Sequence, residues 1–176
     1  MITLGKKLPY ALPPLVGESL LRSSLCAILI VPSSSLTGTV SLLSKMETPR
    51  YAIHAATTNK QLNLVFLQGS DSPQPSSPIL DIVGTTTNGP VDLLLRSSFE
   101  GTFDVSTSHT NQAEFSSEST PESDPLGLGR RQHVDFTTNT KSRKEGRVYW
   151  GDLEDGREVG HVELSTSNAP ASILIQ

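Results

Sequence analysis

The sequence predicts an all-β protein in which short strands form a parallel, solenoid-like stack. Three nine-residue segments read almost as copies of one another, at positions 56–64, 85–93 and 165–173. Each begins with small hydroxylated residues, reaches an asparagine and ends in alternating apolar positions. One such unit of turn plus strand cannot bury its apolar side alone, so its repetition favours stacking of one copy on the next.

The turn in each copy is marked by an asparagine, at Asn59, Asn88 and Asn168. The short amide side chain of asparagine tolerates left-handed backbone and hydrogen-bonds nearby main chain, which suits it to a turn. In a parallel stack, equivalent Asn and Thr side chains are expected to form ladders in which each amide bonds to the next. A fourth, degraded copy over 106–115 has His109 at the turn.

The distance along the chain between turns supports stacking. It is 29 residues from Asn59 to Asn88 and 21 residues from Asn88 to His109, and solenoid coils commonly contain about 20–29 residues. The alternative is an antiparallel two-sheet β-sandwich in which the same segments are ordinary hairpin turns. Both stay open, because alternation alone does not separate parallel from antiparallel strands.

Along the chain, residues 1–24 are expected to be irregular, with a short helix as an option over 16–24, and to be the remnant of a longer N-terminal segment. From Leu25 onward, apolar residues alternate with polar ones in short runs, which indicates about ten strands with one buried face. Two polar segments, 68–78 and 116–129, are expected to be exposed loops. Because the repeat occurs on both sides of each loop, residues 25–176 are expected to form a single β-repeat domain.

Composition argues against several classes of protein. The chain of 176 residues has a formal net charge of −4, so no overall field attracts nucleic acid or an anionic membrane. No segment reaches the ~18 apolar residues of a membrane span. The single cysteine, Cys26, rules out an internal disulfide framework and is expected to pack as a small apolar residue. With no secretion signal and no Asn-x-Ser/Thr sequon, the sequence favours an intracellular protein.

Further elements resemble a known family. A Phe-x-Gly-x-Phe step occupies 99–103, and the segment 148–152 is similar to a Val-Gly-Asp-like element. Together with the repeated Ser/Thr-x-Asn segments, the chain from about Glu47 to the end resembles a fungal domain family of unknown function, which is itself similar to bacterial adhesin-like "toast-rack" domains of parallel β repeats. Only Asn88 keeps the glycine that this family has after the turn asparagine. The resemblance implies a fold and not a reaction.

The histidines and serines form no recognisable catalytic or metal-binding motif. The four histidines, His54, His109, His133 and His161, are isolated in sequence, and a zinc site is therefore not expected. No Gly-x-Ser-x-Gly elbow occurs, although a Ser-His-Asp triad could assemble in space. A calcium-loop pattern begins at Asp152, but its sixth position is Arg157 where glycine is required, so an acidic turn is the better account. The sequence predicts no catalytic, cofactor-binding or metal-ligating residue.

Two groups of charged residues are the remaining candidates. Asp81, Asp92 and Asp104 each lie between apolar neighbours, so alternation turns them outward; three on one face would form the kind of paired-carboxylate cleft that carbohydrate-cleaving enzymes need. Six of the 14 basic residues lie between positions 130 and 147: Arg130, Arg131, Lys141, Arg143, Lys144 and Arg147. They form either a docking site for an acidic partner or phosphate groups, or a solvated hairpin.

The sequence therefore predicts a non-enzymatic β-repeat module with a structural or interaction role and no cofactor. Its expected ligand is a protein or a glycan, nucleic acid is not favoured, and open sheet edges allow self-association. The alternative is a carbohydrate-active enzyme with carboxylates on a β-helical face. A third reading is weak phosphate binding through the basic segment 130–147.

Overall fold

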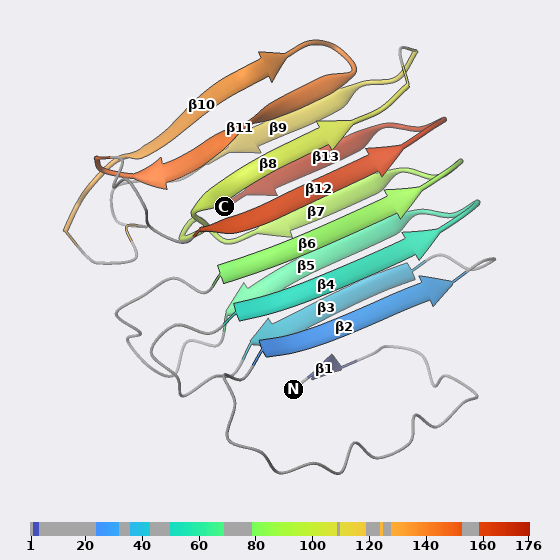
Figure 1. Ribbon diagram of the computed structural model, residues 1–176, viewed down its shortest axis with the longest axis horizontal. Coiled ribbons are helices and arrows are strands. Elements are labelled where there is room, and N and C mark those ends of the chain that lie inside the picture. Colours follow the sequence, from blue (N-terminus) through green and yellow to red (C-terminus); the bar gives the residue numbers. More distant parts are fainter. Residues whose placement is uncertain are drawn as a thin grey trace.

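The computed structural model describes residues 2–3, 24–31, 36–42, 50–68, 79–108, 110–118, 124, 128–152 and 159–176. Within these residues the chain forms thirteen strands and no helix, which confirms the all-β fold class. The strands are arranged in two sheets that lie one in front of the other (Figure 1). The expected helix over 16–24, the turn at His109 and most of the two expected loops lie outside the described residues.

Pairing within both sheets is mostly parallel. The six-stranded sheet has the order β1 (Ile2–Thr3), β3 (Leu36–Leu42), β5 (Leu62–Gln68), β7 (Val91–Leu95), β13 (Ala171–Ile175) and β9 (Ala113–Ser117). The seven-stranded sheet has the order β10 (Gln132–Asn139), β11 (Arg143–Trp150), β8 (Gly101–Ser106), β12 (Gly160–Thr166), β6 (Ile79–Thr86), β4 (Arg50–Thr57) and β2 (Ser24–Val31). Among the described strands, only the pairs β1–β3, β10–β11 and β11–β8 are antiparallel. This is the pairing of the expected stack and not of the antiparallel sandwich.

One strand of the seven-stranded sheet and the next strand along the chain, which lies in the other sheet, make up a coil. The described residues form five coils: β2–β3, β4–β5, β6–β7, β8–β9 and, after the hairpin β10–β11, β12–β13. Their order in space differs from their order in sequence. The C-terminal coil β12–β13 is inserted between β6–β7 and β8–β9, and the hairpin β10–β11 extends the seven-stranded sheet beyond β8 (Figure 1). Successive copies of the repeat therefore stack from β4–β5 to β6–β7, as expected. The next copy along the chain, in β8–β9, does not stack on β6–β7, because β12–β13 lies between them.

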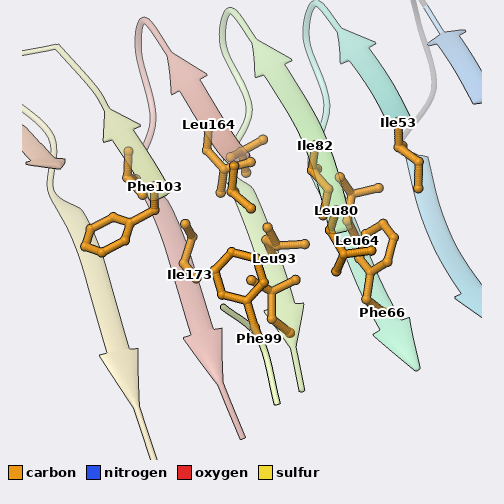
Figure 2. Close-up of a cluster of buried hydrophobic side chains, with 14 of the residues drawn as sticks. Ile53, Leu64, Phe66, Leu80, Ile82, Leu93, Phe99, Phe103, Leu164 and Ile173 are labelled. Carbon is orange, nitrogen blue, oxygen red and sulfur yellow. The ribbon is translucent and has the colours of Figure 1, made fainter. Parts of the chain in front are cut away.

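The hydrophobic core lies between the two sheets. Strands such as β7 and β13 alternate buried and half-buried residues, and the buried set comes from both sheets, as Figure 2 shows for Leu93 and Ile173 beside Ile82 and Leu164. At one end of the stack an aromatic cluster covers the core. There Phe103 and Phe115 are stacked with ring centroids 4.0 Å apart, and Phe136 meets both edge-on. Phe136 is still 41% exposed, so it forms the outer surface of this cap.

The turn asparagines form the predicted ladder. The Nδ2 of Asn88 donates to Oδ1 of Asn59 at 2.6 Å, and the Nδ2 of Asn168 donates to Oδ1 of Asn88 at 2.7 Å. The main chain follows the same pattern, because the amides of Asn88 and Asn168 donate to the carbonyls of Thr58 and Thr87. The predicted use of left-handed backbone is wrong: no described residue other than glycine has a positive φ. Asparagine is selected here for its side-chain hydrogen bonds between coils.

Candidate functional site

The outer face of the seven-stranded sheet carries most of the polar candidates. Register places Asp135, Arg147, Thr102, His161 and Asp81 in one row across β10, β11, β8, β12 and β6. Directly opposed residues on one face of a sheet have Cβ atoms about 4.5–5.5 Å apart. The fold therefore brings together side chains from five different strands, which we call the outer row.

The predicted aspartates do not share one face. Asp81 lies on β6 and Asp104 on β8, both on the outer face of the seven-stranded sheet, but Asp92 lies on β7 in the other sheet. Register separates Asp81 and Asp104 by the whole width of β12, because β12 pairs with β6 on one side and with β8 on the other. The three carboxylates therefore do not form the single cleft that the enzyme hypothesis requires.

Each of the three aspartates also has partners on its own sheet. Asp81 accepts from Nε of Arg50 at 2.7 Å, and Asp104 accepts two bonds from the Arg143 guanidinium, at 3.1 and 2.7 Å. On the other sheet Asp92 accepts from Gln61 at 3.0 Å and from Ser172 at 2.6 Å. These contacts hold the carboxylates in place along the strands, as expected for cross-strand pairs that stabilise a sheet.

The basic residues between 130 and 147 are not a continuous basic surface. Arg130 pairs with the buried Asp124 at 2.8 Å and donates to the carbonyl of Trp150 at 3.1 Å. Arg143 contacts Glu145 at 3.2 Å besides its bonds to Asp104. Two lysines donate to neutral groups, Lys141 to the carbonyl of Thr110 and Lys144 to the side chain of Asn139. The concentration of charge in sequence is thus largely a set of structural contacts.

The Asp124–Arg130 pair anchors the segment that leads into β10. The carboxylate of Asp124 also accepts from the main-chain amides of Leu128 and Arg130, at 3.0 and 2.9 Å. Because the Asp124 side chain is only 1% exposed, these bonds are needed to offset the loss of hydration. This pair has the geometry of a structural anchor, which could not be predicted because a single Asp in a polar segment of sequence is not distinctive.

Arg147 differs from its basic neighbours. It is half-buried on the outer row, and its Nε is buried without a hydrogen-bond partner among the described residues. Asp135 lies directly opposite on β10, but Oδ2 of Asp135 accepts instead from the Tyr149 hydroxyl at 3.0 Å. The ion pairs of β11 within the described part of the chain belong to Arg143.

On the other side of Arg147, the outer row continues with a hydroxyl and an imidazole. Oγ1 of Thr102 lies 2.8 Å from Nδ1 of the exposed His161. If Thr102 donates in this bond, the His161 tautomer carries its proton on Nε2 and directs a donor to solvent. Arg147, Thr102 and His161 therefore present three hydrogen-bonding side chains on adjacent strands.

A pair of rings borders this row. His133 on β10 and Tyr149 on β11 are stacked, with centroids 5.2 Å apart and planes inclined by 17°. The hydrogen bond to Asp135 raises the pKa of Tyr149, desolvation and the Asp135 charge add to this, and the positive charge of Arg147 opposes it. The Tyr149 phenol therefore stays protonated to a higher pH than an ordinary tyrosine does. Sequence reasoning missed Thr102 and this ring pair, because only the strand register places them beside Arg147.

The described part of the chain holds no candidate metal site. No three His, Cys, Asp or Glu side chains among the described residues are placed to hold a metal ion. His54, His133 and His161 are exposed. Asp152 is exposed, and the remainder of the calcium-loop pattern up to position 158 lies outside the described residues.

Comparison of the chain with protein-family models, with curated proteins and with solved structures found no match. Among the described residues there is also no helix of the length and apolarity that crossing a membrane requires. The function must therefore be argued from the geometry of the site itself.

Proposed function

We propose that the protein is a non-enzymatic β-repeat interaction module that binds a glycan on the outer face of the seven-stranded sheet. The observation that carries the proposal is the ring pair His133–Tyr149 beside the hydrogen-bonding groups of the outer row. A sugar ring offers an apolar face for stacking and hydroxyls for hydrogen bonds, and aromatic rings next to polar side chains suit both. A solenoid-like, toast-rack framework related to adhesin-like domains is part of the same proposal.

The rigidity of the framework supports a binding role. The sheets are held in register along whole strands, and the turns are tied by the asparagine ladder. A preorganised surface loses little conformational entropy when a ligand binds. The alternative role as a carbohydrate-cleaving enzyme needs two carboxylates on opposite sides of a sugar bond, whereas Asp104 is held by Arg143 and Asp92 lies on the opposite sheet.

The test uses two exposed glutamates on opposite faces of the molecule. Glu163 lies on β12, in the seven-stranded sheet, and Glu114 lies on β9, in the six-stranded sheet. Glu163→Arg and Glu114→Arg make the same charge change on different faces. A panel of labelled oligosaccharides, neutral and acidic, is titrated against the full chain and both variants by fluorescence polarisation, and the recovered ligands are sized by mass spectrometry.

We expect at least one oligosaccharide to bind and to be recovered at its original length. Its affinity should change at least fivefold with Glu163→Arg and less than twofold with Glu114→Arg. Shortened oligosaccharides would favour the enzyme alternative. A change with Glu114→Arg alone would move the site to the other sheet, and no binding by any member of the panel would contradict a glycan-binding role.

A further inference from the structure

The guanidinium of Arg147 has no anionic partner within the described part of the chain. Its Nε is shielded from water and forms no hydrogen bond within the described residues. A buried donor without a partner costs free energy, and the cost is larger when the donor is charged. Because Nε itself is shielded, an external anion would reach the terminal guanidinium nitrogens, which are not among the buried atoms without a partner. It would be attracted by the positive charge that these nitrogens share with Nε.

The protein's own carboxylates near Arg147 are engaged elsewhere. Asp135, directly across on β10, accepts from Tyr149. Glu145, two residues earlier on the same face, is 3.2 Å from Arg143 and accepts from Thr138 at 3.2 Å. Arg147 therefore lies among acidic groups, yet no described ion pair includes its guanidinium.

The groups next to Arg147 could hold the same anion. Thr102 is its register partner on β8, and His161 is the register partner of Thr102 on β12. A guanidinium offers parallel N–H donors that fit the two oxygens of a carboxylate. The hydroxyl of Thr102 and the imidazole of His161 are hydrogen-bonding groups that can contact a hydroxyl beside that carboxylate.

We infer that the outer row, centred on Arg147, is a subsite for the carboxylate of an acidic sugar, a hexuronate unit of an oligosaccharide. This inference rests on the proposed function and names the class of its ligand. One carboxylate fits better than several sulfates or phosphates, because Asp135, Glu145 and Glu163 on the same face would repel a dense polyanion. The ring pair His133–Tyr149 lies where the adjoining sugar unit would stack.

The experiment varies the ligand by one chemical group. An oligosaccharide with one hexuronate unit and its methyl ester have the same length and hydroxyls, but only the acid carries the carboxylate. Both are titrated by calorimetry against the full chain, Arg147→Gln and Arg131→Gln. Arg131 is an exposed arginine of the same basic segment, so Arg131→Gln is the matched control for loss of one positive charge.

For the full chain we expect the acid to bind at least tenfold more tightly than its ester. Arg147→Gln should lower the affinity for the acid to that for the ester, and Arg131→Gln should change it less than twofold. Thermal unfolding of Arg147→Gln shows whether the variant is folded; Arg147→Lys, which keeps the charge but not the paired donors, should bind the acid with intermediate affinity.

The inference would be overturned by equal affinity for acid and ester, by an unchanged affinity in Arg147→Gln, or by tighter binding of a sulfated oligosaccharide of the same length. Free acetate at the same concentration distinguishes the carboxylate alone from the carboxylate carried on a sugar. If it binds Arg147 as tightly as the oligosaccharide, the sugar has no part in recognition and the inference fails. If Arg147→Gln binds as the full chain does while Glu163→Arg changes the affinity at least fivefold, the proposed function stands and only this subsite is wrong.

Discussion

At the scale of single residues, the threonines at the strand ends show how each coil depends on hydrogen bonds to the coils beside it. Thr57, Thr86 and Thr166 lie in register at the ends of β4, β6 and β12, and each is 6% exposed. The hydroxyl of Thr86 donates to the carbonyl of Gly89, and Thr166 donates to the same carbonyl at 3.1 Å. Oγ1 of Thr57 is buried and has no partner among the described residues.

Because the Thr57 hydroxyl has no hydrogen-bond partner in the described part of the chain and the Thr86 hydroxyl has one, the isosteric change of threonine to valine should affect stability differently at the two positions. Thr86→Val should destabilise the protein by about 1–2 kcal/mol, because it leaves the buried Gly89 amide, which donates to Oγ1 at 3.0 Å, without that acceptor. Thr57→Val removes an unsatisfied hydroxyl and should be neutral or stabilising by up to about 1 kcal/mol. Urea unfolding followed by the fluorescence of Trp150, the single tryptophan, measures both. Equal destabilisation by the two changes would contradict this account of the threonine row.

At the scale of the turn and its strands, the packing around Gly89 explains why one copy of the repeat keeps a glycine after its asparagine. A Cβ built at Gly89 would lie 2.2 Å from the carbonyl oxygen of Lys60 in the neighbouring coil. The glycine is therefore required by the close approach of two turns. The corresponding residues of the other two coils, Lys60 and Ala169, both carry a Cβ.

Gly89→Ala should push the two turns apart and weaken the asparagine ladder. We expect a loss of about 1–3 kcal/mol in the free energy of unfolding, as for other overpacked sites. Hydrogen exchange should also be faster at the Asn88 amide, which donates to Thr58 across the same contact. The control is Ala169→Gly, which removes a Cβ at the corresponding position and should cost no more than about 1 kcal/mol. A stable Gly89→Ala protein with unchanged exchange would show that the turn adapts without strain.

The elements also show what the sequence could and could not predict. The ladder could be predicted because Asn59, Asn88 and Asn168 repeat one local pattern, and any parallel stacking of that pattern brings the amides together. Which asparagine follows Asn88 in the ladder could not be predicted, since nothing in the sequence near Asn168 indicates that β12–β13 pairs with β6–β7. For the same reason Arg147 was visible only as one of six basic residues, and its lack of a partner depends on which strands lie beside β11.

At the scale of the whole molecule, the inserted C-terminal coil determines how the fold is completed. β12 pairs with β6 and β8, and β13 pairs with β7 and β9, so the last coil joins two parts of the stack that otherwise share no strand pairing. The contacts of this coil are long-range, since Asn88 and Asn168 are 80 positions apart in the sequence. Long-range parallel pairing is slow to form, so the stack closes only after the C-terminal segment has docked.

Removal of residues 160–176 should therefore be far more damaging than removal of a coil at the edge. Without β12 and β13, the four strands that flank them lose a neighbour, and buried residues such as Phe103 and Ile82 lose the packing of Val162. We expect loss of the cooperative urea transition and a red-shifted Trp150 emission, because water reaches a core that the last coil covers.

Removal of residues 1–49 takes away β1, β2 and β3, which lie at one edge of the two sheets, and should leave a cooperative transition at lower urea. Addition of a synthetic 159–176 peptide to the shortened chain should restore the Trp150 signal, since the gap between β6 and β8 matches that strand in register. A shortened chain that unfolds cooperatively at the same urea concentration as the full chain would show that β6–β7 and β8–β9 close directly on each other.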